Sequence, residues 1–196
     1  MKIKKMIAIC KQNKCIRLFN SKDGQWLSDG YAIFPMYDLP FFDGDSICRT
    51  YDITEKQQSK IVFNFEAALP TALNFEDTVD NEQLLTNGDL ILLDGGRKLI
   101  PYITESGIAF LDGKYLDVVS DYEEGGIDVY ARRDTDGDLY FAVKSGFILI
   151  GIIAPVRVIN SDFVKRIKNL SQMCEVALFN DSTVENNQQN MFEKEP

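Results

Sequence analysis

Histidine is absent from this chain of 196 residues. Because histidine is the commonest general base and the usual activator of serine and cysteine nucleophiles, its absence excludes Ser-His-Asp and Cys-His hydrolases. The sequence also lacks the phosphate-binding G-x-x-x-x-G-K-[ST] loop, the G-x-G-x-x-G fingerprint, and the H-E-x-x-H and S-x-x-K motifs. We therefore expect a non-enzymatic protein that carries no cofactor.

Cysteine pairs and long apolar runs are missing as well. The longest apolar run, Phe147 to Pro155, is far below the ~20 residues that a membrane-spanning helix needs. The apolar stretch Met6 to Cys10 is too short for the core of a signal peptide. We expect a cytoplasmic protein that does not enter the membrane. Its scattered cysteines predict reduced thiols without a disulfide framework: Cys10, Cys15, Cys48 and Cys174.

Aspartate-glycine pairs, in contrast, are abundant. Both residues tolerate positive φ, so the pair is a strong signal for a tight hairpin turn. Aromatic residues are also plentiful, which suits half-buried strands. The sequence therefore predicts short strands joined by tight turns. The pair occurs six times, in six of the thirteen glycines, with its aspartates at positions 23, 29, 43, 94, 112 and 136.

Four of these pairs belong to a pattern that occurs twice, at an offset of 65 to 69 residues. The pattern has an apolar residue before a first Asp-Gly, an apolar-apolar-Pro phrase, and then a second Asp-Gly. It predicts an internal duplication, in which one structural unit is used twice. The first set is 27–30, 33–35 and 41–44, and the second is 92–95, 99–101 and 110–113.

Apolar patterning predicts strands in both halves and a few short helices. The expected helices are one capped by Asp45 or Ser46 that runs through Tyr51, one over 114–122, and one capped by Asn160 or Ser161 that runs through Leu170. A helical turn is expected near 82–85. Strands are expected at 3–10, 15–19, 25–35 in two pieces, 61–65, 89–93, 97–103, 107–111, 127–132, 138–143, 147–158 and 174–179.

These elements predict an α+β fold that is mainly antiparallel β, with two similar subdomains. We expect a first β-rich subdomain over residues 1–70 and a second over 89–179. Residues 71–88 connect them, and 180–196 form a polar tail that we expect to be flexible.

Charge is unevenly distributed along the chain, whose net charge is −9. Residues 1–22 hold seven basic side chains and no acidic one. An acidic body binds nucleic acid poorly because phosphate contacts dominate that affinity, but a concentrated basic segment supplies one positive face. The alternative interpretation is a solvated first hairpin with lysines on its outer side.

Three phrases resemble the DNA sliding clamps, the processivity rings of replicative polymerases, including clamps encoded by phages or mobile elements. They are Trp26-Leu-Ser-Asp-Gly-Tyr-Ala-Ile33, Gly113-Lys-Tyr-Leu-Asp-Val-Val119 and Ala142-Val-Lys-Ser-Gly-Phe-Ile-Leu-Ile-Gly-Ile-Ile-Ala-Pro-Val-Arg157. The order of hairpin strands, short helix and further strands, used twice, is also similar to a clamp. The chain departs from that pattern because most basic residues fall on expected N-terminal strands, whereas helices line the hole of a clamp.

The resemblance implies a homo-oligomeric ring around double-stranded DNA, without base readout, that organises replication proteins. It makes a set of basic side chains the candidates for facing DNA. Those on or near the expected helices are Lys56, Lys60, Lys114, Lys165, Arg166 and Lys168. Those of the N-terminal segment are Lys2, Lys4, Lys5, Lys11, Lys14 and Arg17.

Two other functions are consistent with the sequence. The first is a protein-interaction or immunity-type module of a mobile element that binds through its acidic surface. The second is a metal-dependent enzyme that uses aspartates, for which Asp134, Asp136 and Asp138 are the candidate ligands of Ca²⁺ or Mg²⁺. Counting from Asp134, the position of the bidentate glutamate of an EF-hand is Ser145, so a hairpin turn is the favoured interpretation of this triplet.

Overall fold

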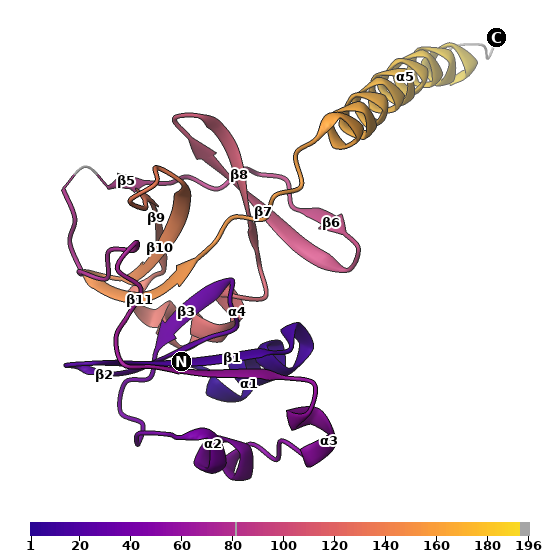
Figure 1. The fold of residues 1–196 in the computed structure, drawn as a ribbon. Helices are drawn as coiled ribbons and strands as arrows, with labels where there is room; N and C mark the ends of the chain where they lie inside the picture. The colour runs from indigo at the N-terminus through magenta and orange to yellow at the C-terminus, as the bar shows by residue number, and fades with distance from the viewer. Residues whose placement is uncertain (81, 193–196) are drawn as a thin grey trace. The chain divides into compact units, whose positions relative to one another are not determined.

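A computed structural model describes residues 1–80 and 82–192, and the side chains of these except 123–125 and 181–192. The chain forms two compact units, Met1–Val156 and Arg157–Pro196. The first unit is an α+β arrangement of one eight-stranded and one three-stranded sheet with short helices (Figure 1). The second contains the helix α5 (Ser161–Phe192). No described helix is both long enough and apolar enough to cross a bilayer.

The eight-stranded sheet has the order β4-β1-β2-β3-β11-β10-β9-β5. It is mixed, because β1 and β4 run parallel while the other neighbours are antiparallel. Its strands are β1 (Cys15–Ser21), β2 (Gly24–Ser28), β3 (Ala32–Pro35), β4 (Val62–Glu66), β5 (Gln83–Leu84), β9 (Asp128–Arg133), β10 (Leu139–Ser145) and β11 (Ile148–Ile153).

The three-stranded sheet is antiparallel in the order β6-β7-β8. Isolated bridges at Asn87–Tyr102 and Phe110–Val156 join it to the segments that follow β5 and β11 of the larger sheet. The segments that contain Asn87 and Val156 thus connect the two sheets within one unit. Its strands are β6 (Leu92–Asp94), β7 (Arg97–Thr104) and β8 (Gly107–Asp112), and the helices of this unit are α1 (Ile3–Asn13), α2 (Gly44–Thr50), α3 (Glu55–Gln58), α4 (Leu116–Val119) and the 3₁₀ helix η1 (Ser120–Gly125).

The core lies on both faces of the large sheet. On one face, Met6 and Cys10 of α1 are buried with Ile16 and Leu18 of β1. On the other face, a second cluster around Trp26 is covered by apolar residues of the segment between β4 and β5. The long connection between the sequence halves is thus packed over the sheet, which buries apolar surface and offsets the entropy of ordering it.

The strand expected at 3–10 is wrong, because Ile3–Asn13 forms α1. The buried residues Met6, Ile7, Ile9 and Cys10 recur at helical spacing, so one side of a helix packs on the sheet. Lys14, with φ of 55°, then takes the left-handed conformation that ends the helix. The expected order of the first three elements is therefore corrected from three strands to a helix and two strands.

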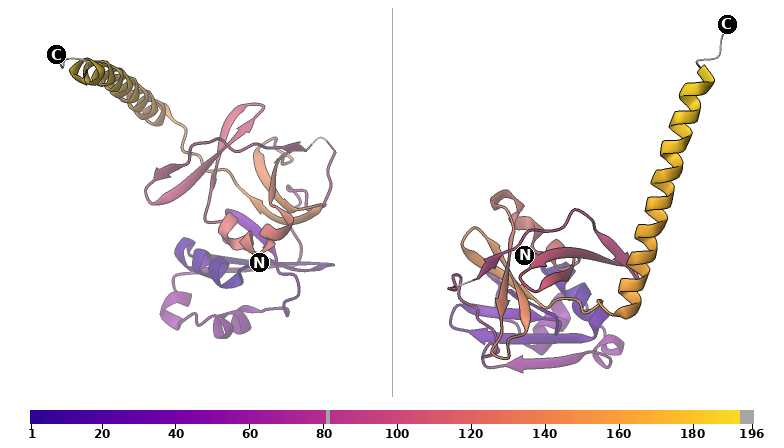
Figure 2. Two further views of the ribbon diagram at one scale, coloured as in Figure 1. Left: turned by 180° about the vertical axis from the view of Figure 1, so that it is seen from behind. Right: turned by 90° about the horizontal axis from the view of Figure 1, so that it is seen from above.

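Two more expected elements are corrected. The strand at 174–179 lies inside α5, which continues unbroken to Phe192 and is seen side-on in Figure 2. The turn near 82–85 is the strand β5, which pairs with β9. In both places the short apolar stretch fits the period of a helix as well as that of a strand, and the neighbouring residues decide which of the two forms.

Four Asp-Gly pairs lie between antiparallel strands, as the turn signal predicts, at aspartates 23, 29, 94 and 136. The pairs at 43 and 112 precede helices instead. Asp43 is the N-cap of α2, in place of the expected Asp45 or Ser46, and it accepts a hydrogen bond from the Ser46 backbone amide. An aspartate caps helix N-termini as readily as it forms turns, which explains the difference.

Candidate functional site

The basic residues of the N-terminal segment lie on a helix. Lys4 and Lys11 are seven residues, about two turns, apart and therefore lie on the same side of α1. Met6 and Cys10 on the other side are buried against the sheet. The burial of the apolar side leaves the lysine side chains at the surface.

At the N-terminal end of α1, acidic residues pair with two of the candidates. Lys2 donates a hydrogen bond to the Ser120 hydroxyl and lies 3.2 Å from the Asp121 carboxylate. Lys5 Nζ lies 3.8 Å from the Asp117 carboxylate. These exposed pairs contribute little stability, but they lower the positive potential at this end of the helix.

At the other end of α1, four candidates come together on adjoining segments. Lys11 Nζ donates to the Tyr51 carbonyl at 2.9 Å, so the C-terminal turn of α1 contacts the end of α2. The Lys14 carbonyl accepts from the Val62 amide at 3.0 Å, which places it at the start of β4. The polar segment before β4 carries Lys56 and Lys60. We call Lys11, Lys14, Lys56 and Lys60 the lysine corner.

The lysine corner is mostly open to an anion. Lys14, Lys56 and Lys60 are exposed. Within the described part of the chain, no carboxylate forms an ion pair with any of these three. Their charges are thus available to a partner.

The remaining basic candidates lie elsewhere. Arg17 is on β1, whose neighbouring residues Ile16 and Leu18 face α1, so its side chain is on the opposite face of the sheet. Lys114 Nζ lies 3.5 Å from the Asp112 carboxylate and 4.9 Å from the centre of the Tyr115 ring. The other three are on α5, in the second compact unit: Lys165, Arg166 and Lys168.

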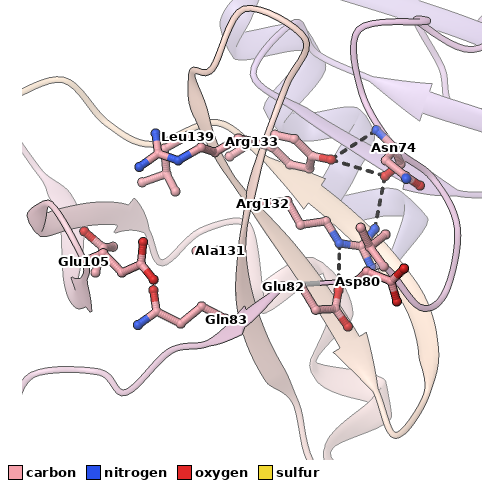
Figure 3. Close-up of a pocket in the computed structure, with 12 residues that line it drawn as sticks. Asn74, Asp80, Glu82, Gln83, Glu105, Ala131, Arg132, Arg133 and Leu139 are labelled. Carbon is pink, nitrogen blue, oxygen red and sulfur yellow. Dashed lines mark hydrogen bonds and ion pairs between the residues drawn. The ribbon is translucent and has the colours of Figure 1, made fainter.

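A cleft of about 330 Å³ lies beside β9 and β10 (Figure 3). The segment before β5, the end of β7 and the two strands form its lining, which includes Asp80, Glu82, Glu105 and Arg132. Arg132 is almost fully buried, with its side chain 2% exposed. A buried guanidinium demands partners for all of its N–H groups, so its contacts decide what this cleft can do.

Arg132 is saturated by the segment that crosses it. Its Nε donates to Glu82 Oε2 at 2.8 Å, and one terminal nitrogen lies 2.6 Å from the same oxygen. The other terminal nitrogen donates to the carbonyls of Asn74 and Glu76, at 3.1 and 2.9 Å. Figure 3 shows Arg132 pointing toward Asn74 and Glu82. The guanidinium therefore fastens Asn74, Glu76 and Glu82 to the sheet and has no donor to spare for a ligand.

Glu82 is shared with a second buried cation. Lys144, whose side chain is 4% exposed, donates to Glu82 Oε1 and lies 4.4 Å from the centre of the Tyr130 ring. Burial acts to raise the pKa of the Glu82 carboxyl, but hydrogen bonds from Lys144 and Arg132 outweigh it and lower that pKa. Glu82 is thus held as a carboxylate between two cations, which suits an anchor and not a proton donor.

A second buried carboxylate, Asp29, is satisfied without a cation. Tyr115 donates to Asp29 Oδ2 at 2.7 Å, and Asn13 donates to the same oxygen at 2.6 Å. The amides of Tyr31 and Ala32 donate to Oδ1. These contacts tie α1, the β2–β3 turn and the start of α4 together, and they leave no oxygen facing a substrate.

The aspartate triplet forms a turn. Asp134 Oδ1 accepts from the amides of Asp136 and Asp138, at 2.9 and 2.8 Å. Its carboxylate is therefore engaged by the β9–β10 connection. Within the part of the chain that the structure describes, no group of three or more Asp, Glu or Cys side chains is arranged to hold a metal ion.

Sequence reasoning missed the cluster of Arg132, Glu82 and Lys144. A signal for the cations existed, because Arg132 and Lys144 interrupt apolar strands. The carboxylate that neutralises them is 50 residues before Arg132, and nothing local indicates that pairing.

Comparison of the chain with protein-family models, with curated proteins and with solved structures gives no match. The function must therefore be argued from the surfaces and contacts described above.

Proposed function

We propose that this chain is a clamp-like, non-enzymatic protein that associates with DNA and acts as a processivity or scaffolding factor. The observation that carries the proposal is the lysine corner. Three exposed lysines that form no ion pair with a described carboxylate lie there on adjoining segments, on a chain whose net charge is −9. A local positive surface on an acidic protein attracts phosphate at one place and repels it elsewhere.

The helical structure of residues 3–13 supports this proposal. In a sliding clamp, helices present basic side chains to DNA, and the expected N-terminal strands were a departure from that pattern. With α1 in place of a strand, Lys4 and Lys11 lie on one side of a helix that ends at the lysine corner. Such an arrangement contacts phosphates without reading bases.

The duplicated sequence pattern gives further support. In the first set, the β2–β3 connection contains Asp29-Gly30, and Asp43-Gly44 begins α2. In the second set, the β6–β7 connection contains Asp94-Gly95, and Asp112-Gly113 precedes α4. The first set is a hairpin followed by a helix, and the second is a hairpin, the further strand β8 and then a helix. Two clamp-like subdomains, and a ring of several copies, remain parts of the proposal.

Titration of a fluorescent DNA duplex tests the proposal by anisotropy. We expect binding that is equal for AT-rich and GC-rich duplexes and that weakens steeply between about 50 and 200 mM salt. The variant Lys14→Ala/Lys60→Ala removes two proposed phosphate contacts. Its slope of log affinity against log salt should be smaller by about 1.8, at about 0.9 per contact.

A matched control variant has the same net charge as Lys14→Ala/Lys60→Ala. Lys22→Ala/Lys98→Ala removes two exposed lysines outside the lysine corner. It should reduce affinity much less than the Lys14→Ala/Lys60→Ala change does. Equal losses in both variants, or no salt-dependent binding by the unmodified protein, would overturn the proposal.

A further inference from the structure

Most apolar side chains of α5 are exposed along the part of the helix whose side chains the structure describes. No side chain from residue 161 to 180 is buried. Leu170, Met173 and Leu178 are 54%, 70% and 72% exposed. Because an isolated helix in water gains no packing energy, apolar side chains at this exposure indicate a surface that is covered by something else.

Four apolar residues of α5 follow the spacing of a coiled-coil seam, while the exposed Val176 and Phe179 lie off it. Ile167, Leu170, Cys174 and Ala177 alternate by three and four residues, which places them on one stripe. In the sequence, Leu170 and Ala177 continue at seven-residue spacing to valine and methionine at 184 and 191, whereas Ile167 and Cys174 continue to aspartate and glutamine at 181 and 188, so the apolar seam spans 167–177. A stripe with this repeat is complementary to another helix with the same repeat, and a second α5 has it.

The charges on α5 favour one orientation. Lys165, Arg166 and Lys168 lie in its first turns, whereas Glu175 and the acidic residues at 181 and 185 follow later in the sequence. A parallel pair sets the basic ends side by side. An antiparallel pair sets each basic end beside the acidic part of the other helix, and it also opposes the two helix dipoles.

We propose that α5 is a self-association element, through which two copies of this chain pair as an antiparallel two-helix coiled coil. The seam consists of Ile167, Leu170, Cys174 and Ala177, flanked by Met173 and Leu178. This inference goes beyond the proposed DNA association and does not depend on it, because it uses no residue of the lysine corner.

Light scattering of the full chain after size-exclusion chromatography tests the pairing, from about 5 to 200 µM. The unmodified protein should approach the mass of a dimer as concentration rises. Ile167→Glu/Leu170→Glu places charge in the seam and should give a monomer. Asn169→Glu/Gln172→Glu adds the same charge away from the seam and should retain the dimer.

Circular dichroism shows whether α5 unfolds in the seam variant Ile167→Glu/Leu170→Glu. Its circular dichroism should lose helix signal in step with the dimer, while the melting transition of the remainder of the chain stays unchanged. A monomer throughout the concentration range for the unmodified protein would overturn the proposal. So would loss of the dimer in the control variant alone.

Distance measurement between spin labels tests the orientation. Cys15 is half-buried and is replaced by serine, and the exposed Cys174 is replaced by alanine, which keeps its seam position apolar, before a label is placed on Ser161→Cys. An antiparallel pair centred on the seam, with Ile167 of one helix opposite Ala177 of the other, separates the two labels by about 33 Å, from about 22 residues at a rise of 1.5 Å per residue. A separation below about 20 Å would indicate parallel helices and refute the antiparallel arrangement.

A membrane surface is the competing occupant of an amphipathic helix. Sedimentation with vesicles of phosphatidylserine and phosphatidylcholine distinguishes the two. We expect the dimer to stay in solution. Binding to vesicles by a protein that is monomeric without them would replace self-association by membrane association.

Discussion

Replacement of Glu82 by glutamine is the most informative single change in the buried charge cluster. Glu82→Gln keeps the shape of the side chain but removes the negative charge between Arg132 and Lys144. The amide nitrogen must also take the place of one carboxylate oxygen, so it presents hydrogens to a cation. The result is two buried cations without a counter-charge.

The burial of the three side chains determines how much Glu82→Gln lowers the free energy of unfolding. Arg132, Lys144 and Glu82 are 2%, 4% and 10% exposed, so water screens their interaction weakly. Removal of one partner from a buried ion pair costs about 3–5 kcal/mol. For a unit of this size, the melting temperature should fall by about 2–4 °C for each kcal/mol. Urea denaturation with a matched thermal scan measures both quantities.

An exposed ion pair serves as the control. Arg49 lies 3.6 Å from the Asp45 carboxylate, and the two side chains are 82% and 86% exposed. Asp45→Asn should change the free energy of unfolding by less than about 1 kcal/mol, because solvent screens the pair. The difference between the two variants isolates the effect of burial from the effect of removing one acidic charge.

The pH dependence supplies a second test with a definite sign. The cations lower the pKa of Glu82 in the folded protein from its ordinary value of 4.5. Its charge therefore stabilises the fold fully above that value, and this contribution disappears as pH falls through the lower, folded pKa. The advantage of the unmodified protein over Glu82→Gln should shrink below pH 4.5 and stay constant above about pH 6.

Two results would refute the reasoning. One is a loss of less than about 1 kcal/mol in Glu82→Gln, which would show that water reaches the cations and screens them. The other is a difference between the two proteins that does not vary with pH. The double variant Glu82→Gln/Lys144→Met should recover part of the loss, since it removes one of the uncompensated charges.

Gly151→Ala should lower the free energy of unfolding by about 1–3 kcal/mol in urea, because the new methyl group would lie 2.6 Å from ring carbons of Phe34. Tyr115→Phe should cost about 1–3 kcal/mol, because it removes a donor to the buried Asp29 carboxylate. Burial and the neighbouring Asp29 raise the pKa of the Tyr115 phenol, so the variant and the unmodified protein should show the same alkaline absorbance change while folded. Burial likewise raises the pKa of the Cys10 thiol, so Ellman's reagent should modify the exposed cysteine of α5 first and Cys10 only on unfolding.

The sequence predicts the hairpin strands well because their signals are local. The strands around Asp94-Gly95 and Asp136-Gly137 lie within a few residues of their expected bounds. In each case an alternating apolar stretch meets a turn that glycine permits, and both requirements are met inside about ten residues. The α+β class follows from the same signals.

Longer-range features escape such reasoning. The pairing of β1 with β4 is parallel and joins segments that are more than forty residues apart, with α2 and α3 between them. The contact between Glu82 and Arg132 crosses 50 residues. No local pattern indicates which distant strand or carboxylate completes these contacts, because burial in the folded chain selects the partner.

The change from an expected strand to the helix α1 matters most for function. The repeat of a helix differs from that of a strand, so it decides on which side each charged residue lies. In a strand, Lys4 and Lys5 would face opposite sides of the sheet, and half of the lysines would meet the core. In the helix, the apolar residues take the buried side and every lysine of the segment reaches the surface. The positive charge of Lys2 and Lys5 is then offset by acidic residues near α4. The proposed DNA contact therefore uses the C-terminal end of α1 and the segment before β4, and not the whole basic N-terminus.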